Sequence, residues 1–222
     1  IPARYLDLVA LGTVADVVPL DHNNRILVQQ GLSRMRAGHA VPGIIALLRQ
    51  SGRSLARCVS SDLGFAVGPR INAAGRLEDI AVGIECLLTD DANKAAECAH
   101  ALDQINKDRR DIEATMREQA FRYVDALGEQ RWPNCVCVFE PDWHQGVVGL
   151  IAARVRERCY RPVIAFAREN DDKLKGSARS IPGVHIRDLL EAVSTVKPGM
   201  IDKFGGHAMA AGLTIAAAKL ES

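Results

Sequence analysis

Residues 89–128 read TDDANKAAECAHALDQINKDRRDIEATMREQAFRYVDALG, and the organisation of the whole chain follows from this stretch. Apolar side chains recur along it mostly at steps of three and four residues, and charged side chains fill most of the other positions. The apolar positions are Ala92, Ala95, Ala99, Leu102, Ile105, Ile112, Met116, Ala120, Tyr123 and Leu127. This spacing predicts one long amphipathic helix, with Thr89 or Asp90 as its N-cap and Gly128 at its end. A helix of about 50 Å, at about 1.5 Å per residue, is typical of a connection between two lobes.

The residues before this helix, 1–88, form the first predicted lobe. Their segment Leu6–Val18 is apolar with polar interruptions. That pattern is typical of a strand or a helix end that breaks into a loop beside a sheet edge. Helical patterns follow at 23–37 and 42–50, each bounded by glycine. The chain opens on the apolar pattern without a lead-in, so we expect it to be a piece of a longer protein.

The residues after the helix, 129–222, change to an α/β pattern. Short apolar runs predict strands, and two amphipathic stretches predict helices. The predicted strands are 134–140, 161–169, 173–181 and 212–216, and the predicted helices are 146–159 and 183–193. We therefore expect an α/β fold in which the second lobe has a small mixed sheet flanked by helices.

The composition sets limits on the class of protein. The chain has 222 residues, of which 48% are hydrophobic and 25% charged, and this is ordinary globular composition. Its net charge of +1 does not by itself indicate a nucleic-acid partner. No apolar run reaches the roughly 18 residues of a membrane span, so no membrane partner is expected. The 6 cysteines include no Cys-x-x-Cys pair, which argues against zinc and disulfides and favours a reducing cytoplasm.

Asp16 is the first candidate for chemistry. It ends the apolar segment just after Gly12-Thr13, a position where α/β proteins place metal or phosphate ligands. The alternative is a carboxylate that only caps the next turn. A single carboxylate does not hold Mg²⁺ or Mn²⁺ as a catalytic pair. If Asp16 is a ligand, its partner ligands lie outside this chain.

Residues 60–80, SSDLGFAVGPRINAAGRLEDI, predict a change from helix to loop. Ser60 or Ser61 would cap a short helix, and Gly68-Pro69 would end it. The loop that follows carries two arginines and an asparagine on a backbone of small residues. These are Arg70, Asn72 and Arg76. Guanidinium groups suit phosphate oxygens, and the alternative is a tight turn whose arginines pair with the acids at 78–79.

The second predicted lobe carries two further candidate groups. His144 follows Trp143 in the loop between a strand and a helix, where free N–H groups favour anions. His144 would otherwise only cap that helix, and Trp143 is either a stacking surface for a base or part of the core. Strand alternation places Ser177 and Arg179 on one face, where a hydroxyl and a guanidinium can bind one phosphate. The alternative for this pair is a polar, exposed edge strand.

The stretch KFGGHAMAAG at 203–212 is the last candidate. Gly205 and Gly206 allow positive φ and can leave successive N–H groups pointing at an anion. His207, at the start of a predicted helix of small residues, can donate to a phosphate oxygen or act as an acid. A histidine after two glycines is also common in purely structural turns. Together, the candidates of both lobes indicate a cleft for a phosphorylated ligand.

The motifs LVALGTVADVVPL, GPRINAAGRL, WHQGVVGLIAARV, KGSARSI and KFGGHAMAAGL occur in this order. This series resembles the single-strand-specific 5′→3′ exonucleases of the DHH phosphoesterase superfamily, and the likeness covers nearly the whole chain. It implies the C-terminal part of a DHH lobe over 1–88, a connecting helix over 89–128, and a DHHA1 lobe over 129–222.

The resemblance also implies roles for residues. Asp16 matches the family's last metal-binding motif and would ligate one of two Mn²⁺ or Mg²⁺ ions. His207 matches the DHHA1 motif that faces the metals and the scissile phosphate, so both residues would be catalytic. Ser177 and Arg179 match the residues that hold the 5′ phosphate or the nearby backbone. The other implied substrate-binding positions are Arg70, Asn72, Arg76, His144, Gly205 and Gly206.

The activity that the resemblance implies is metal-dependent degradation of single-stranded DNA from its 5′ end to mononucleotides, in DNA repair and recombination. The implied protein is a cytoplasmic monomer whose partners are 5′-phosphorylated single-stranded DNA, a single-strand-binding protein and a helicase. The family's DxD and Asp-His-His motifs and its OB-type domain do not occur in this sequence. We therefore expect the 222-residue chain alone to be inactive.

Three other functions stay open at the level of the sequence. The first is a phosphodiesterase of the same superfamily that acts on oligoribonucleotides or cyclic dinucleotides. The second is a non-catalytic replication scaffold that binds single strands without cutting them. The third is an interaction module in which the long helix binds a partner.

Overall fold

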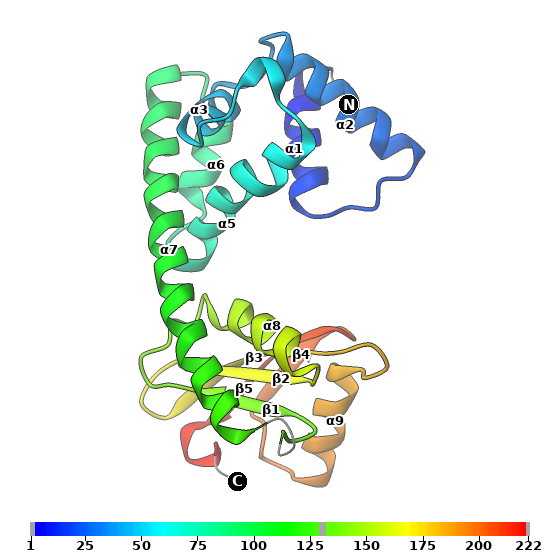
Figure 1. The fold of residues 1–222 in the computed structure, drawn as a ribbon, viewed down its shortest axis with the longest axis vertical. Helices are drawn as coiled ribbons and strands as arrows, with labels where there is room; N and C mark the ends of the chain where they lie inside the picture. Colours follow the sequence, from blue (N-terminus) through cyan, green and yellow to red (C-terminus); the bar gives the residue numbers. More distant parts are fainter. Residues whose placement is uncertain (1–2, 129–131, 221–222) are drawn as a thin grey trace. The chain divides into compact units, whose positions relative to one another are not determined.

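The computed structural model describes residues 3–128 and 132–220 (Figure 1). The chain forms two compact units, and the division falls between Arg109 and Arg110, inside helix α7 (Ala92–Leu127). The predicted domain boundary at residue 129 lies outside the described residues. The predicted fold class is confirmed, because a mainly helical part accompanies a small mixed sheet.

The first unit consists of helices packed around one core. In chain order, its elements before α7 are η1 (Ala3–Tyr5), α1 (Leu6–Ala15), α2 (His22–Arg36), α3 (Pro42–Gln50), η2 (Leu55–Arg57), α4 (Ser60–Asp62), η3 (Leu63–Val67), α5 (Gly68–Leu77) and α6 (Ala81–Leu88). The helices predicted at 23–37 and 42–50 are thereby confirmed. Fully buried side chains from several of these helices fill the core. They include Met35, Ile44, Leu47, Leu48, Leu63 and Leu102.

The strand alternative for the segment Leu6–Val18 is wrong, and no strand occurs among the described residues of the first unit. The segment forms helix α1, which packs closely against α2. A Cβ atom at Gly31 of α2 would collide with the carbonyl oxygen of Leu6 and the Cβ of Ala10. An apolar run of this length fits either a helix or a strand, so helix–helix packing decides its structure.

The prediction that Gly68-Pro69 ends a helix is also wrong. These residues begin α5, which continues directly from α4 and the single π-helical turn η3. Pro69 has no N–H to donate, and it stands where the π-helical turn gives way to α5, so the missing hydrogen bond falls at the change of helix type. Neither predicted serine caps α4. Instead, the Asp62 carboxylate accepts a hydrogen bond from the Val59 N–H at 3.0 Å.

Helix α7 has 36 residues and, at about 1.5 Å each, a length of about 54 Å. Its N-cap is Asp91 rather than Thr89 or Asp90, because the Asp91 carboxylate accepts from the Asn93 N–H at 2.8 Å. The predicted end is confirmed. Gly128 follows Leu127 with φ of +73°, a left-handed conformation that glycine adopts readily.

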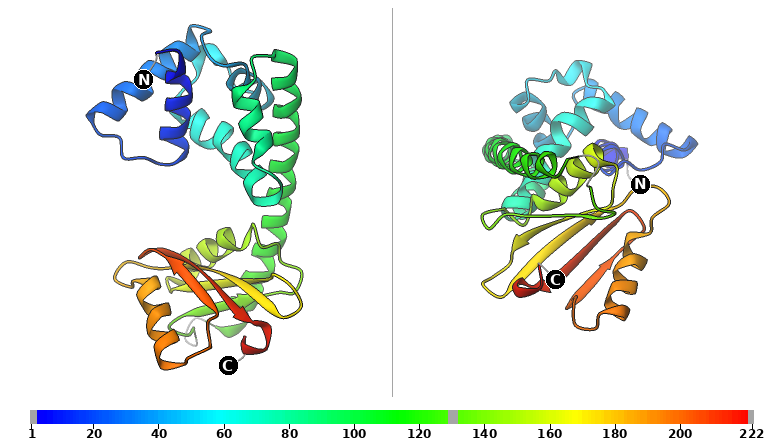
Figure 2. Two further views of the ribbon diagram at one scale, coloured as in Figure 1. Left: turned by 180° about the vertical axis from the view of Figure 1, so that it is seen from behind. Right: turned by 60° about the horizontal axis from the view of Figure 1, so that its bottom comes forward.

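The second unit contains a five-stranded mixed sheet with a helix on each face (Figures 1 and 2). Its elements are β1 (Val136–Phe139), α8 (Val148–Cys159), β2 (Val163–Arg168), β3 (Lys173–Arg179), α9 (Ile186–Val196), β4 (Lys203–Gly206), β5 (Ala210–Ala216) and η5 (Ala217–Lys219). The strand order is β1-β2-β3-β5-β4, with β1 and β2 parallel and the other pairs antiparallel. The predicted strands and both predicted helices of this part are therefore confirmed.

The stretch KFGGHAMAAG forms a hairpin, so the prediction that a helix follows Gly206 is wrong. Strand β4 ends at Gly206, and β5 begins at Ala210 after a three-residue turn. Gly206 has φ of +149°, and a Cβ atom there would lie 2.5 Å from the Ala210 carbonyl oxygen. Small residues form good helices in isolation, but here pairing with β3 holds them in a strand.

Candidate functional site

Ser177 and Arg179 lie on the same face of β3, as strand alternation predicts. The Arg179 Nη1 atom donates to the Ser177 Oγ at 3.0 Å and to the Ala178 carbonyl oxygen at 2.8 Å. Both side chains are half-buried. These hydrogen bonds hold a hydroxyl and a guanidinium side by side, and the two groups can bind one phosphate together.

The first turn of α8 packs directly against this pair. A Cβ atom at Gly149 would lie 2.9 Å from the Arg179 Nη2 atom and 3.1 Å from the Ser177 Oγ. Gly149 is the second residue of α8, so the positive end of the helix dipole lies beside the guanidinium and the hydroxyl. A helix N-terminus, a guanidinium and a hydroxyl in contact favour an anion at this place.

The loop before α8 holds both aromatic candidates. His144 is half-buried, and its Nδ1 atom accepts from the Gly146 N–H at 3.1 Å. Its carbonyl oxygen accepts from the Val147 N–H at 3.0 Å, so His144 closes the turn that leads into α8. Trp143 is only 5% exposed and donates from Nε1 to Gln119 at 2.9 Å. Of its two interpretations, the core one is confirmed.

His207 lies in the exposed turn of the β4–β5 hairpin. Its N–H donates to the Ala210 carbonyl oxygen at 2.8 Å. The rest of the turn is fixed by the N–H groups of Ser180 and Ile186, which donate to the carbonyl oxygens of residues 209 and 208 at 3.0 and 2.9 Å. Because Ala210 is also the register partner of Arg179, His207 lies at the same end of the sheet as Arg179.

Asp16 and Asn72 come together in the first unit, where both line a cavity of about 360 Å³ with mainly apolar walls. Asp16 is the C-cap of α1. The two N–H groups that follow close the helix end, with Val17 donating to Val14 at 3.2 Å and Val18 to Thr13 at 3.0 Å. Val17 has φ of +54°, which is unusual for a β-branched residue.

The α5 helix carries the other first-unit candidates on different faces. Asn72 and Arg76 are four residues apart, so they lie on the same face of α5. Asn72 on this face lines the cavity described above. Arg70 points elsewhere and donates from Nε and Nη2 to the Asp103 carboxylate of α7 at 2.8 and 2.7 Å. Its partner is therefore not one of the acids at 78–79.

Asp103 is buried, and among the described residues three side chains donate to its carboxylate. Besides Arg70, the donors are Lys107 at 3.0 Å and Gln50 at 3.2 Å. Burial alone would raise the pKa of this carboxyl, but the hydrogen bonds from Lys107, Gln50 and Arg70 outweigh it and lower the pKa. The network ties α3 and α5 to α7 within the first unit.

The described residues do not complete a metal site. Among residues 3–128 and 132–220, no group of three or more His, Cys, Asp or Glu side chains is placed to hold an ion. Asp16 therefore fits the predicted Mn²⁺ or Mg²⁺ site as one carboxylate only. No helix in this part of the chain is long and apolar enough to cross a membrane.

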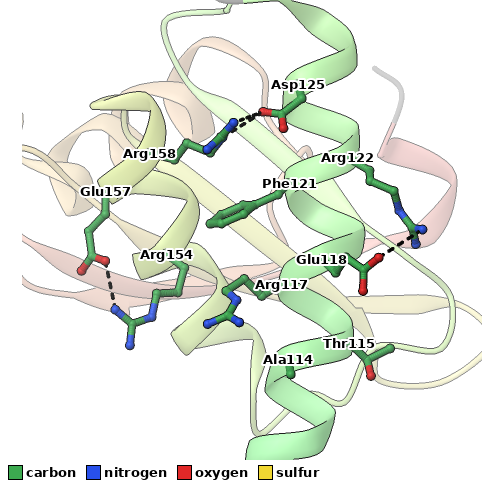
Figure 3. Close-up of a pocket in the computed structure, with 10 residues that line it drawn as sticks. All are labelled: Ala114, Thr115, Arg117, Glu118, Phe121, Arg122, Asp125, Arg154, Glu157 and Arg158. Atoms are coloured by element: carbon green, nitrogen blue, oxygen red, sulfur yellow. Dashed lines mark hydrogen bonds and ion pairs between the residues drawn. The ribbon is translucent and has the colours of Figure 1, made fainter.

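A cavity of about 1150 Å³ between α7 and α8 contains none of the predicted site residues (Figure 3). Its charged side chains mostly pair with one another, as in the Arg158–Asp125 pair at 2.7 Å and the Arg154–Glu157 pair at 3.1 Å. The Arg158 guanidinium also lies 5.2 Å from the centre of the Phe121 ring. This cavity therefore lies at the outer edge of the contact between α7 and α8, and its charged groups mostly bind one another.

Sequence reasoning missed two residues that position the candidates. Gly149 touches Ser177 and Arg179, and Asp103 binds Arg70. A glycine inside the amphipathic pattern of 146–159 was a signal of close approach by another element. Nothing local distinguished Asp103 from the other charged residues of α7.

Known proteins with similar sequences include a domain family and a group of exonucleases. Residues 133–222 match the family model of the DHHA1 domain. Over 96% of its length, the chain is 58% identical to the single-stranded-DNA-specific exonuclease RecJ of Dickeya dadantii (strain 3937). It is 55% identical, over the same share, to RecJ of Escherichia coli (strain K12). The chain spans only 37% of the length of each of these relatives.

Solved structures that match the chain are also of RecJ. A crystal structure of RecJ in complex with Mg²⁺ from Thermus thermophilus matches 99% of the chain with a TM-score of 0.84 and 32% identity. The chain covers 33% of that structure. A structure of the same RecJ with Mn²⁺ also matches with a TM-score of 0.84, at 31% identity. The resemblance to this group of the DHH superfamily, predicted from the motifs, is confirmed.

Proposed function

We propose that this chain is part of a metal-dependent exonuclease that degrades single-stranded DNA from its 5′ end to mononucleotides. The observation that carries the proposal is the contact of Ser177 and Arg179 with the N-terminal turn of α8 at Gly149. This contact offers a guanidinium, a hydroxyl and a helix N-terminus to an anion, in a chain that is 58% identical to part of a single-stranded-DNA-specific exonuclease. A chain end bearing a 5′ phosphate is the ligand that fits both findings.

The second unit binds the DNA in this proposal. The Arg179 guanidinium and the Ser177 hydroxyl hold the 5′ phosphate, and the α8 dipole favours its negative charge. His144 fixes the loop that leads into α8, so it positions this site. His207, exposed in its turn, donates to a phosphate oxygen near the scissile bond, and Gly205 and Gly206 let the DNA backbone approach. These groups recognise phosphate and not base edges, so the DNA sequence is not read.

The first unit contributes a metal ligand and further phosphate contacts. Asp16 supplies one carboxylate to a Mg²⁺ or Mn²⁺ site whose other ligands are not among the described residues. The bound metal ions would polarise the phosphate and activate water. Asn72 and Arg76 contact DNA from their shared face of α5. Arg70 already uses three donors on Asp103 and the Ala66 carbonyl oxygen, so it acts with fewer free donors.

The wider role rests on the resemblance to RecJ. It supports action in DNA repair and recombination, in the cytoplasm and as a monomer. It also supports a single-strand-binding protein and a helicase as partners. Because the described residues do not complete a metal site, we propose that the chain alone releases no nucleotides from 5′-phosphorylated single-stranded DNA with Mn²⁺ present. Robust turnover by the purified chain would contradict this part of the proposal.

Binding measurements test the phosphate site independently of turnover. Fluorescence anisotropy would compare labelled single strands bearing a 5′ phosphate with strands bearing a 5′ hydroxyl. We expect Arg179→Ala to weaken binding of the phosphorylated strand by about 10- to 100-fold, since a charge-assisted hydrogen bond contributes about 1.5–3 kcal/mol. The control is Arg187→Ala, which removes an exposed arginine that pairs with Glu191 on α9. An unchanged preference in Arg179→Ala would place the 5′ phosphate elsewhere.

A further inference from the structure

The register of β3, β5 and β4 aligns two lysines on the face that carries Ser177 and Arg179. Lys175 of β3 pairs with Thr214 of β5, and Thr214 pairs with Lys203 of β4. Directly paired residues of antiparallel strands point to the same face. Because Lys175 is two residues from Ser177, its side chain lies on the Ser177 face. Lys175, Thr214 and Lys203 thus form one row across three strands, here called the lysine row.

The neighbouring row on this face has almost no side chains. It consists of Ser177, Gly212 and Gly205, which are paired across the same three strands. A Cβ atom at Gly205 would meet nothing within 4 Å, and one at Gly212 would meet only the Gly176 carbonyl oxygen at 3.9 Å. Both glycines are exposed. The row Ser177, Gly212 and Gly205 is therefore a flat surface with almost no side chains, here called the glycine floor, and it lies beside the lysine row.

The opposite face of these strands is closed. Leu213 and Ile215 of β5 are buried there in a cluster with Ile186 and Leu190 of α9. The helix on the Ser177 face, α8, packs on β2 and β3. The face of β5 and β4 that carries the lysine row is therefore the part of the sheet surface that stays open to a ligand.

The two lysines are available for an anion. Both are exposed, and within residues 3–128 and 132–220 neither ammonium group has an ion pair or hydrogen bond. Lys173, one row further along β3, differs because it pairs with Asp202 at 3.3 Å. A cavity of about 260 Å³ lies at the lysine row and is lined by all three strands, with Lys175, Lys203, Gly205 and Gly212 among its walls.

We propose that the lysine row is a second phosphate-binding subsite, which holds a backbone phosphate of single-stranded DNA next to the one at Ser177 and Arg179. The rows are two residues apart along β3, or about 7 Å at about 3.4 Å per residue, a step that one nucleotide can span. The strand then crosses the glycine floor, where its sugar and base meet no side chain. This inference rests on the proposed function, because it needs the first phosphate at Ser177 and Arg179.

The test compares ligands of different length on the full chain. Two ligands are titrated with the natural chain and with the double variant Lys175→Ala/Lys203→Ala. Binding of 5′-phosphorylated oligo(dT) of about ten nucleotides is measured by fluorescence anisotropy. Binding of thymidine 5′-monophosphate is measured by its competition with the labelled oligonucleotide. We expect the oligonucleotide to bind about tenfold more weakly at low salt. The slope of log K against log salt concentration should become shallower by about 0.7, the value for the loss of one phosphate contact on a single strand. Binding of the mononucleotide, which reaches only Ser177 and Arg179, should not change.

Two comparisons make the result decisive. Lys173→Ala removes a lysine from the same face and strand, but one already paired with Asp202, and it should weaken binding much less. An equal loss in Lys173→Ala, an equal loss of mononucleotide binding, or no loss in the double variant would each overturn the subsite. If Arg179→Ala weakens binding and the double variant does not, only the lysine row fails. If Arg179→Ala has no effect either, or the chain binds no DNA at low salt, the proposed function fails as well.

Discussion

The contact of Gly149 with Arg179 and Ser177 leads to the sharpest prediction, for the variant Gly149→Ala. The new Cβ atom would lie 2.9 Å from the Arg179 Nη2 atom, where ordinary van der Waals contact begins at 3.4 Å. The guanidinium must therefore move by about 0.5 Å, the difference between these distances. Because it is the far end of a flexible side chain, it can move at little cost to the fold.

The two consequences of this change have opposite signs. Hydrogen bonds from a guanidinium to phosphate lie at about 2.7–2.9 Å, so a shift of this size removes one of them. The loss is about 1.5–3 kcal/mol, which is about 10- to 100-fold in affinity for a 5′-phosphorylated strand. Alanine in place of glycine in a helix contributes up to about 1 kcal/mol of stability. We expect weaker binding from a chain that is equally stable or more stable.

The assay pairs anisotropy on 5′-phosphorylated single strands with the free energy of unfolding from denaturant titration. The same substitution in an Arg179→Ala background is the control, because only the closer approach to the Ser177 Oγ, at 3.1 Å, then remains and the further loss of binding should be small. An additive loss in the double variant would refute the argument that Gly149 acts through Arg179. So would normal binding by the single variant.

Three other predictions concern the framework around the candidate residues. Asp103→Ala leaves Arg70 without its buried partner and should lower the free energy of unfolding by about 3 kcal/mol at neutral pH, measured by denaturant titration. Since the pKa of Asp103 is lowered below 3.8 in the folded state, its stabilisation is complete above that pH and is lost as the pH falls through the folded value. The difference between the two proteins should therefore be smaller at about pH 3, and an equal difference at both pH values would contradict this origin. Val17 is 85% exposed and has a left-handed backbone conformation, so Val17→Gly should raise the free energy of unfolding by about 0.5–1 kcal/mol. A lower free energy of unfolding would show that the valine side chain contributes to the fold. Gly206→Ala should destabilise the hairpin by about 2 kcal/mol or more and lower the temperature of thermal unfolding, whereas Gly205→Ala should leave that temperature unchanged. Equal effects of the two variants would contradict the argument that the φ angle and close contacts of Gly206 set it apart.

The sequence was most informative where local pattern and final structure coincide. Apart from β4 and the start of β5, the strands and helices of the second unit follow the periods of two and 3.6 that they keep in the fold, so their existence was predictable. Ser177 and Arg179 lie two residues apart in a strand, and that period alone places them on one face. The contact of this pair with Gly149 was not predictable, because it depends on how α8 crosses the sheet.

The predictions that were wrong also have physical causes, and each cause is a contact between residues far apart in the sequence. The stretch from Gly68 to Arg76 has the composition of a loop, but proline and glycine at a helix start are compatible with α5. Arg70 then finds its carboxylate 33 residues away on α7 rather than beside it in sequence. The residues after His207 have good helix propensity, but β5 is held by pairing on both of its sides. In each case a contact distant in sequence outweighs local preference.

The three-residue turn from His207 to Met209 makes the hairpin sensitive to insertions and deletions. Strand side chains alternate with a period of two, so a change of one residue in this turn that slips β4 against β5 would reverse every side chain of β4. Lys203 and Gly205 would then face α9, and Phe204, which now packs against the core there, would be exposed. Across homologous chains, therefore, we expect this turn to keep its length or to change by two residues. A homologue with a one-residue change there should have lost the basic side chain at the position of Lys203.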